Sequence, residues 1–243
     1  MRTSNKIILG IFLVPLIIIA ALHVTLYAKY KSGNYVSMKN IEADRFIRPA
    51  LKNIDNIVVY GLENFSIVPS DTLSLEIEKD KYGYLHYSIE GNTLVIHGDS
   101  TIQHPDGTKD IQRSYENVNL YLPSTKNITA DNSNVRLKGS SDSLKAGSYQ
   151  FSLLHSASFK TDENNWEDST HKYFNRLLIK ADHASNIEIS AYGYIAELNL
   201  TLLESQFIDN DAQIGKLTMD VDNKSSVTLK GENLKKVNAV KQP

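Results

Sequence analysis

The sequence predicts an all-β fold, a parallel β-solenoid of short strands, preceded by one N-terminal transmembrane helix. Three observations support this prediction. An uncharged apolar segment lies near the N-terminus, apolar and polar residues alternate from Ile54 onward, and a short motif recurs about every 20 residues in the second half of the chain. Alternation with period two is typical of strands, and a fixed period of about 20 residues is typical of stacked repeats.

The apolar segment runs from Ile7 to Tyr27 and contains no Asp, Glu, Lys or Arg. A helix of this length spans roughly 30 Å, the thickness of the hydrocarbon core of a bilayer. We therefore predict a cytoplasmic tail and an uncleaved signal anchor within residues 1–31. A cleaved signal peptide is the alternative, but its apolar core would be shorter and would end in a small-x-small site.

The recurring motif places a small or polar residue before two apolar residues in alternation. Its first apolar positions, which we call the anchors, are 24, 28, 20 and 20 residues apart: Val135, Phe159, Ile187, Phe207 and Val227. Polar clusters precede the anchors and suit tight corners, since Asp, Asn and Ser cap local backbone groups. One repeat cannot bury its apolar face alone, so stacking would supply the core. We predict a linker over 32–53 and this β-domain over 54–243, with an antiparallel β-sandwich as the alternative.

Two further segments carry expectations about local structure. Glu90-Gly91-Asn92-Thr93 predicts a hairpin turn between two alternating runs. The polar, turn-rich residues 98–114 predict an exposed loop.

Composition excludes several classes of function. The 243 residues carry a net charge of −2, which gives no electrostatic reason to bind nucleic acid. The chain has no cysteine, so a thiol nucleophile and a cysteine-bound zinc or iron–sulfur site are excluded. A nucleophile elbow, a phosphate-binding loop, a dinucleotide fingerprint and a His-Glu-x-x-His motif are all missing from the sequence. We therefore expect no enzyme activity and no cofactor.

Two groups of residues are candidates for a site. An insertion between two anchors contains the only tryptophan, acidic residues and a histidine, and it predicts a binding site that includes Asp162, Glu163, Trp166 and His171. Three other residues each lie four positions before an anchor, and in stacked repeats they would lie above one another: Asp131, His155 and His183. Imidazole and carboxylate at this spacing predict a divalent metal site, and a solvated polar stack is the alternative.

Residues 54–240 resemble the bacterial auto-transporter adhesin head-GIN domain family, whose activity is not established. Residues 57–68 resemble the first strand pair of that family, and residues 89–96, Ile-Glu-Gly-Asn-Thr-Leu-Val-Ile, resemble its "EGNTLxI" segment. The resemblance implies a β-solenoid-like fold and an exported or membrane-anchored protein of Bacteroidetes-type bacteria. It supplies no catalytic residues, and this chain has fewer glycines at its corners than typical members.

Together these features predict an adhesin-like, membrane-anchored binding or scaffold module of the cell envelope. We expect a single-pass protein of the bacterial inner membrane, anchored by residues 7–27, with its C-terminal domain in the periplasm. Its expected ligand is an envelope protein or a glycan. The alternative is an envelope enzyme that acts on polysaccharide from a β-solenoid scaffold.

Overall fold

The structure, a computed structural model, describes residues 3–33, 45–79, 85–103, 109–123, 126–161 and 171–239. These residues belong to two compact units, Met1–Arg45 and Phe46–Pro243. The first unit contains helix α1 (Thr3–Lys31), which is long and apolar enough to cross a membrane. Its segment Ile11–Lys31 has a mean hydropathy of 2.4, and none of it is buried within the protein. The same properties fit a signal sequence.

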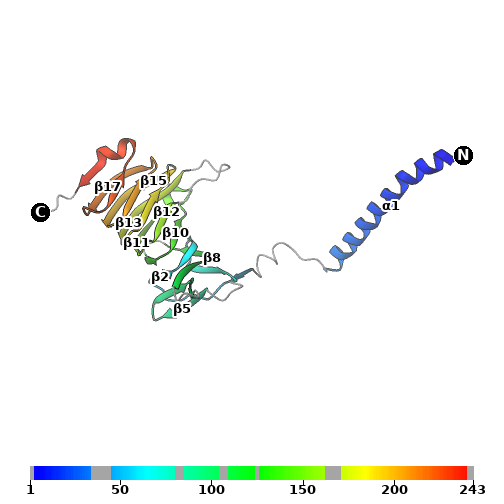
Figure 1. Ribbon diagram of the computed structural model, residues 1–243. Helices are drawn as coiled ribbons and strands as arrows, with labels where there is room; N and C mark the ends of the chain where they lie inside the picture. The colour runs from blue at the N-terminus through cyan, green and yellow to red at the C-terminus, as the bar shows by residue number, and fades with distance from the viewer. Residues whose placement is uncertain are drawn as a thin grey trace. The chain divides into compact units, whose positions relative to one another are not determined.

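The second unit consists of two mostly parallel sheets (Figure 1). The first sheet has the order β1 (Phe46–Ile47), β4 (Ser74–Glu78), β8 (Lys109–Leu122), β3 (Leu62–Pro69), β10 (Asn134–Leu137), β12 (Ser158–Thr161), β14 (Asn186–Ile189), β16 (Gln206–Asp209) and β18 (Ser226–Thr228), and β7 (Asp99–Gln103) pairs with β8. The second sheet has the order β19 (Val237–Ala239), β17 (Gln213–Val221), β15 (Gly193–Leu203), β13 (Lys172–Asp182), β11 (Gly147–Leu154), β9 (Asn127–Asp131), β2 (Asn56–Tyr60), β6 (Thr93–His97) and β5 (His86–Glu90). Two 3₁₀ helices complete the unit: η1 (Ser143–Lys145) and η2 (Gly231–Lys236).

The strand register confirms the predicted alignment of the repeats. From β9 onward the chain alternates between the sheets, and each strand pairs in parallel with the next strand of its own sheet. All five anchors lie in one row across the first sheet, as Val135 opposite Phe159, Phe159 opposite Ile187, Ile187 opposite Phe207, and Phe207 opposite Val227. This parallel pairing differs from that of the antiparallel sandwich considered above.

The core lies between the sheets because inward side chains alternate with outward ones along most strands of the repeats. The buried row of the first sheet includes Phe65, Val135, Phe159, Ile187 and Phe207. The facing row of the second sheet includes Ile57, Ile128, Phe151, Ile179 and Leu200. The rings of Phe151 and Phe159 meet across the core, with centroids 4.7 Å apart. Burying each such side chain contributes roughly 1.5–3 kcal/mol.

The first part of the β unit departs from the repeat pattern. The predicted hairpin is confirmed, because β5 and β6 pair antiparallel around Gly91, whose φ of 64° suits a tight turn. The predicted loop over 98–114 is wrong, because β7 and β8 pair antiparallel from Asp99 opposite Arg113 to Gln103 opposite Lys109. Backbone hydrogen bonds can pair two polar segments without an apolar alternation, so periodicity gave no signal for them. β1 pairs with β4, so strand structure also occurs within the range predicted as a linker.

Candidate functional site

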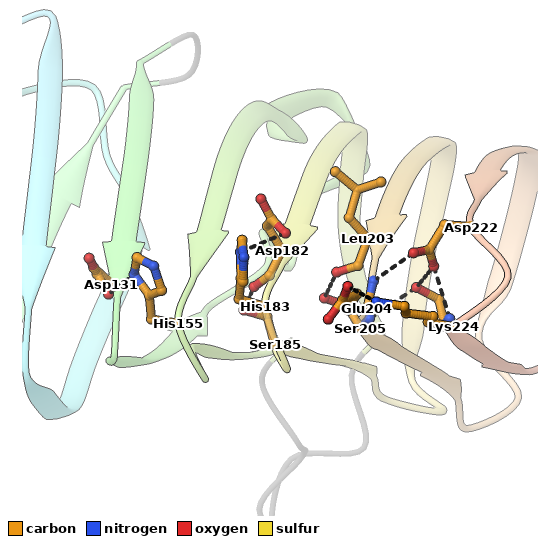
Figure 2. Close-up of polar contacts among 11 residues, drawn as sticks. Asp131, His155, Asp182, His183, Ser185, Leu203, Glu204, Ser205, Asp222 and Lys224 are labelled. Atoms are coloured by element: carbon orange, nitrogen blue, oxygen red, sulfur yellow. Dashed lines mark hydrogen bonds and ion pairs between the residues drawn. The ribbon is translucent and has the colours of Figure 1, made fainter.

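Short turns lead from β2 to β3 and, from β9 onward, from each strand of the second sheet to the next strand of the first sheet. These turns lie side by side (Figure 2). We call them the polar corner, which comprises residues 60–62, 131–134, 154–158, 182–186, 203–206 and 222–226. The first residue after the strand has a left-handed φ in successive turns, as Gly61 (62°), Asn132 (46°), His155 (45°), His183 (50°) and Glu204 (50°) show. The corner therefore requires a backbone conformation that most L-residues disfavour.

Buried serines hold the polar corner from within. Each donates its hydroxyl to a carbonyl oxygen two or three residues earlier, as Ser133 to Asp131 (2.8 Å), Ser185 to Asp182 (2.7 Å) and Ser205 to Leu203 (2.8 Å). The Ser133 oxygen also accepts a hydrogen bond from the backbone amide of Leu62 at 3.0 Å. Sequence reasoning missed this role, although a serine two residues before the anchor was a visible signal in four of the five repeats.

Charged groups on the outer side of the polar corner are paired. The Lys224 ammonium bonds the Glu204 carboxylate, and this contact raises the pKa of Lys224. Asp222 accepts hydrogen bonds from the Ser225 hydroxyl and from the backbone amides of Ser225 and Glu204. The contact with Ser225 is the main reason that the pKa of Asp222 lies below its ordinary value.

Arg113 of β8 holds the first turns of the polar corner. Its guanidinium donates to Glu63 at 3.0 Å, to the side-chain oxygens of Asn132 (2.9 and 3.1 Å) and Asn134 (3.0 Å), and to the Ser156 carbonyl at 3.1 Å. One side chain of β8 thus connects three segments that are distant in the sequence, and the charge of Arg113 is balanced by Glu63.

The structure brings the three predicted metal residues to the polar corner, but in unequal roles. Nδ1 of His155 lies 2.9 Å from Oδ1 of Asp131, and the rings of His155 and His183 have centroids 5.5 Å apart. Nδ1 of His183 lies 2.8 Å from Oδ1 of Asp182, a partner that the sequence analysis did not select. Among the residues that the structure describes, no group of three or more His, Asp or Glu is arranged to hold a metal ion.

The predicted binding insertion is only partly described. Asp162, Glu163 and Trp166 lie outside the described residues. His171 is exposed, and the next residue, Lys172, donates its backbone amide to the carbonyl of Tyr192 at 3.1 Å. The end of the insertion therefore lies beside the turn that leads from β14 to β15.

Exposed tyrosines lie at this end of the second sheet. Tyr173 of β13 is opposite Tyr194 of β15, and their ring centroids are 5.8 Å apart at an interplanar angle of 52°. Tyr192, in the turn before β15, is about half exposed, and Tyr194 is 40% exposed. These rings were not selected from the sequence, because nothing in the alternation separates an outward tyrosine from a packed one.

A groove lies next to Tyr194, between β17 and η2. We call it the tyrosine groove. Its volume is about 410 Å³, and its lining includes Tyr194, Asp211, Gln213, Ile214, Glu232 and Lys236. Lys236 donates to the carbonyl of Ile214 at 3.0 Å and so ties η2 to β17.

The chemistry of the tyrosine groove suits the recognition of a polar ligand. An aromatic face lies beside an amide, carboxylates and an ammonium, which is the mixture expected of a site for a polar ligand with an apolar face. Glu232 is 73% exposed and pairs with Lys235 at 2.9 Å. Glu232 is thus a solvent-exposed hydrogen-bond acceptor at the edge of the groove.

Comparisons with known proteins give no family for this chain. No family model matches it, and no curated protein matches its sequence. Three solved structures resemble it at low TM-score. A "putative lipid binding protein" from Parabacteroides distasonis has 12% identity and a TM-score of 0.28, over 81% of this chain and 96% of that one. A "putative adhesin" from Parabacteroides merdae has 16% identity and a TM-score of 0.28, over 81% and 95% of the two chains. A "putative cell adhesion protein" from Clostridium sporogenes has 8% identity and a TM-score of 0.26, over 76% and 95%. At these scores the likeness carries no conclusion about the function of this chain.

Proposed function

We propose that this chain is a membrane-anchored binding module of the bacterial cell envelope that recognises a glycan at the tyrosine groove. In this proposal α1 is an uncleaved anchor in the inner membrane, and the β unit coils as a β-solenoid in the periplasm. The observation that carries the proposal is the exposed ring of Tyr194, paired with the partly buried ring of Tyr173, beside a groove lined by mixed polar groups.

A sugar ring matches the groups of the groove. Its C–H face is apolar and packs on an aromatic ring, while its hydroxyl groups need both donors and acceptors at the edge. Gln213 supplies both kinds of group, Asp211 supplies acceptors and Lys236 supplies a donor. Tyr173, whose ring lies beside that of Tyr194, offers a second aromatic surface to a longer glycan chain.

Binding is tested with the full-length protein in lipid nanodiscs against an array of bacterial envelope glycans. We expect Tyr194→Ala to weaken binding at least tenfold and Tyr173→Ala to weaken it less. Tyr115→Ala is the matched control, because Tyr115 is an exposed tyrosine of β8 that does not line the groove. Equal binding by Tyr194→Ala and wild type would overturn the groove assignment, and loss of binding only in Trp166→Ala would move the site to the insertion.

A polysaccharide-acting enzyme is the second candidate, because two carboxylates, Asp211 and Glu232, line the same groove. It is tested by incubating the array ligands with the protein and searching for shortened products by mass spectrometry. Product formation that is lost in both Asp211→Asn and Glu232→Gln would favour the enzyme over the binding module.

The anchor is tested separately. We expect the full-length protein to resist extraction from membranes by alkaline carbonate, and its intact mass to include residues 1–31. A mature protein that begins after the apolar segment would show instead that this segment is a cleaved signal peptide.

A further inference from the structure

His155 and His183 lie on neighbouring turns of the polar corner (Figure 2). Leu153 of β11 is opposite Ala181 of β13, and each histidine follows two residues later in its own strand-to-strand turn. The backbone amide of Ser156 donates to the carbonyl of His183 at 2.9 Å, which fixes the two turns together. Both imidazoles are mostly exposed, with 62% of each side chain accessible.

Each imidazole is oriented by a carboxylate at the same ring nitrogen. Asp131 lies 2.9 Å from Nδ1 of His155, and Asp182 lies 2.8 Å from Nδ1 of His183. When a carboxylate accepts the Nδ1 proton of a neutral imidazole, the lone pair is on Nε2. This arrangement is the usual one for histidines that bind metals in proteins.

The distance between the rings suits one shared ion. A metal bound at about 2.0–2.1 Å from Nε2 lies about 3 Å from the ring centroid, so two rings on one ion have centroids at most about 6 Å apart. The observed separation is 5.5 Å. Glu204 on the following turn is engaged by Lys224, and the described residues contain no group of three or more His, Asp or Glu that could hold a metal ion, so water would complete the coordination.

The backbone gives the two histidines the same local conformation. His155, Ser156, His183 and Ala184 all have φ between 45° and 64°. A left-handed conformation costs a residue with a Cβ roughly 1–2 kcal/mol, and the corresponding position of the first turn is Gly61. Asn132 and Glu204 share this conformation, so it is a property of the turns throughout the polar corner, and it places the two histidines at equivalent positions of neighbouring turns.

We propose that His155 and His183 bind one divalent transition-metal ion through their Nε2 atoms, with Asp131 and Asp182 as positioning residues and water at the remaining coordination positions. Imidazole suits Cu²⁺, Ni²⁺ and Zn²⁺, and the expected order of affinity places Cu²⁺ first. The site is distinct from the tyrosine groove, so it does not depend on the proposed function.

The test uses the full-length protein in detergent, stripped with a chelator, and titrated with CuCl₂, NiCl₂ and ZnCl₂ by calorimetry. We expect a stoichiometry of one ion per chain and tighter binding of Cu²⁺ than of Ni²⁺. Binding should be lost in His155→Asn and in His183→Asn, and asparagine tolerates the left-handed backbone at both positions. The electron paramagnetic resonance spectrum of bound Cu²⁺ should show two equatorial nitrogens in the wild type and one or none in each variant.

A second histidine pair gives the matched control. His86 of β5 is opposite His97 of β6, and the ring of His97 stacks on Tyr60. The double variant His86→Asn/His97→Asn should keep the binding of the wild type. Asp131→Asn and Asp182→Asn should weaken Cu²⁺ binding about 10- to 100-fold while the stoichiometry and the two-nitrogen spectrum persist. The proposal is overturned if His155→Asn and His183→Asn each still bind one ion. It is also overturned if the wild type binds no metal at about 1 mM, or if the double variant His86→Asn/His97→Asn loses the binding.

Discussion

The backbone amide of Leu62 donates a hydrogen bond to the hydroxyl oxygen of Ser133 at 3.0 Å, although 71 residues separate them in the sequence. Ser133 is fully buried, and its own proton goes to the carbonyl of Asp131. One hydroxyl group therefore joins two adjacent turns of the polar corner. Without it the buried amide of Leu62 would lose its acceptor.

Ser133→Ala should destabilise the protein by about 1–3 kcal/mol, because a buried donor is left unpaired. The expected readout is a lower midpoint of urea unfolding in the detergent-solubilised protein. The next repeat has Ala157 at the corresponding position, so the alanine side chain itself fits the turn. Ser226→Ala, on the exposed side of the corner, is the control and should leave the midpoint unchanged.

The buried carboxylate of Asp209 supports the C-terminal end of the β unit. It accepts hydrogen bonds from the amides of Ala212 (2.9 Å) and Lys230 (3.2 Å) and from the Asn233 side chain (2.8 Å). Asp209→Ala would leave the amides of Ala212 and Lys230 without this acceptor and would remove one of the two hydrogen bonds of the Asn233 side-chain nitrogen, which should cost roughly 3–5 kcal/mol. We expect faster proteolysis within η2 as well as a lower unfolding midpoint. If Asp209→Ala were no more harmful than Glu232→Ala, a change at an exposed position, this account of the C-terminal end would be wrong.

Ionisation of Tyr149 should lower the stability of the folded protein at alkaline pH. Burial raises the pKa of its phenol from 10.0 to about 12, because ionisation inside the core is unfavourable. The folded state therefore favours the neutral phenol. This preference contributes fully to the free energy of unfolding below pH 10, and the contribution is lost as the pH rises toward 12. Tyr149→Phe should therefore reduce the loss of stability between pH 10 and 12 by up to about 2–3 kcal/mol.

The measurement compares urea midpoints of wild type and Tyr149→Phe at pH 8, 10 and 11.5. Tyr115→Phe is the control, because Tyr115 is an exposed tyrosine and its substitution should not change the slope. Parallel curves for wild type and Tyr149→Phe would contradict a buried, perturbed phenol.

The repeat register could be predicted from the sequence because each repeat must bury one face. Moving a strand by one residue would turn its whole apolar set outward, so the alternation specifies which residues face the core. The anchors Val135, Phe159 and Ile187 consequently pair as their spacing predicts. β7 and the first part of β8, residues 109–114, have no such constraint, and these residues were mistaken for a loop.

The sites were harder to predict than the core. Counting four residues back from the anchors aligned Asp131 with His155, but the strand register places Asp131 opposite Leu154. The count fails because the two turns before the anchors differ in length. His155 still reaches Asp131 through its side chain. The tyrosine groove combines Tyr194 with Glu232 and Lys236 of η2, and no local pattern connects these residues. Sequence periodicity describes which side chains face inward, whereas a site on the outer surface depends on which outward side chains become neighbours.

The ion pair between Lys160 and Glu188 should make stability depend on acidic pH. The two side chains lie on neighbouring strands β12 and β14, with Nζ of Lys160 2.7 Å from Oε2 of Glu188. The hydrogen bond from Lys160 is the main reason that the pKa of Glu188 lies below its ordinary value of 4.5. A lowered pKa stabilises the folded state above pH 4.5, and this contribution is lost as the pH falls below that value. Glu188→Gln should therefore be less stable than wild type at pH 7, by at most about 1 kcal/mol for a partly exposed pair, and should match it near pH 3.

Lys160→Met is the companion variant for the Lys160–Glu188 ion pair, and its stability should likewise converge with that of wild type at low pH. Urea midpoints at pH 7 and pH 3 test both variants, and 0.5 M NaCl should narrow the difference at pH 7, because salt screens exposed charges. A gap between Glu188→Gln and wild type that stays constant from pH 7 to pH 3 would show that the ion pair is not its cause.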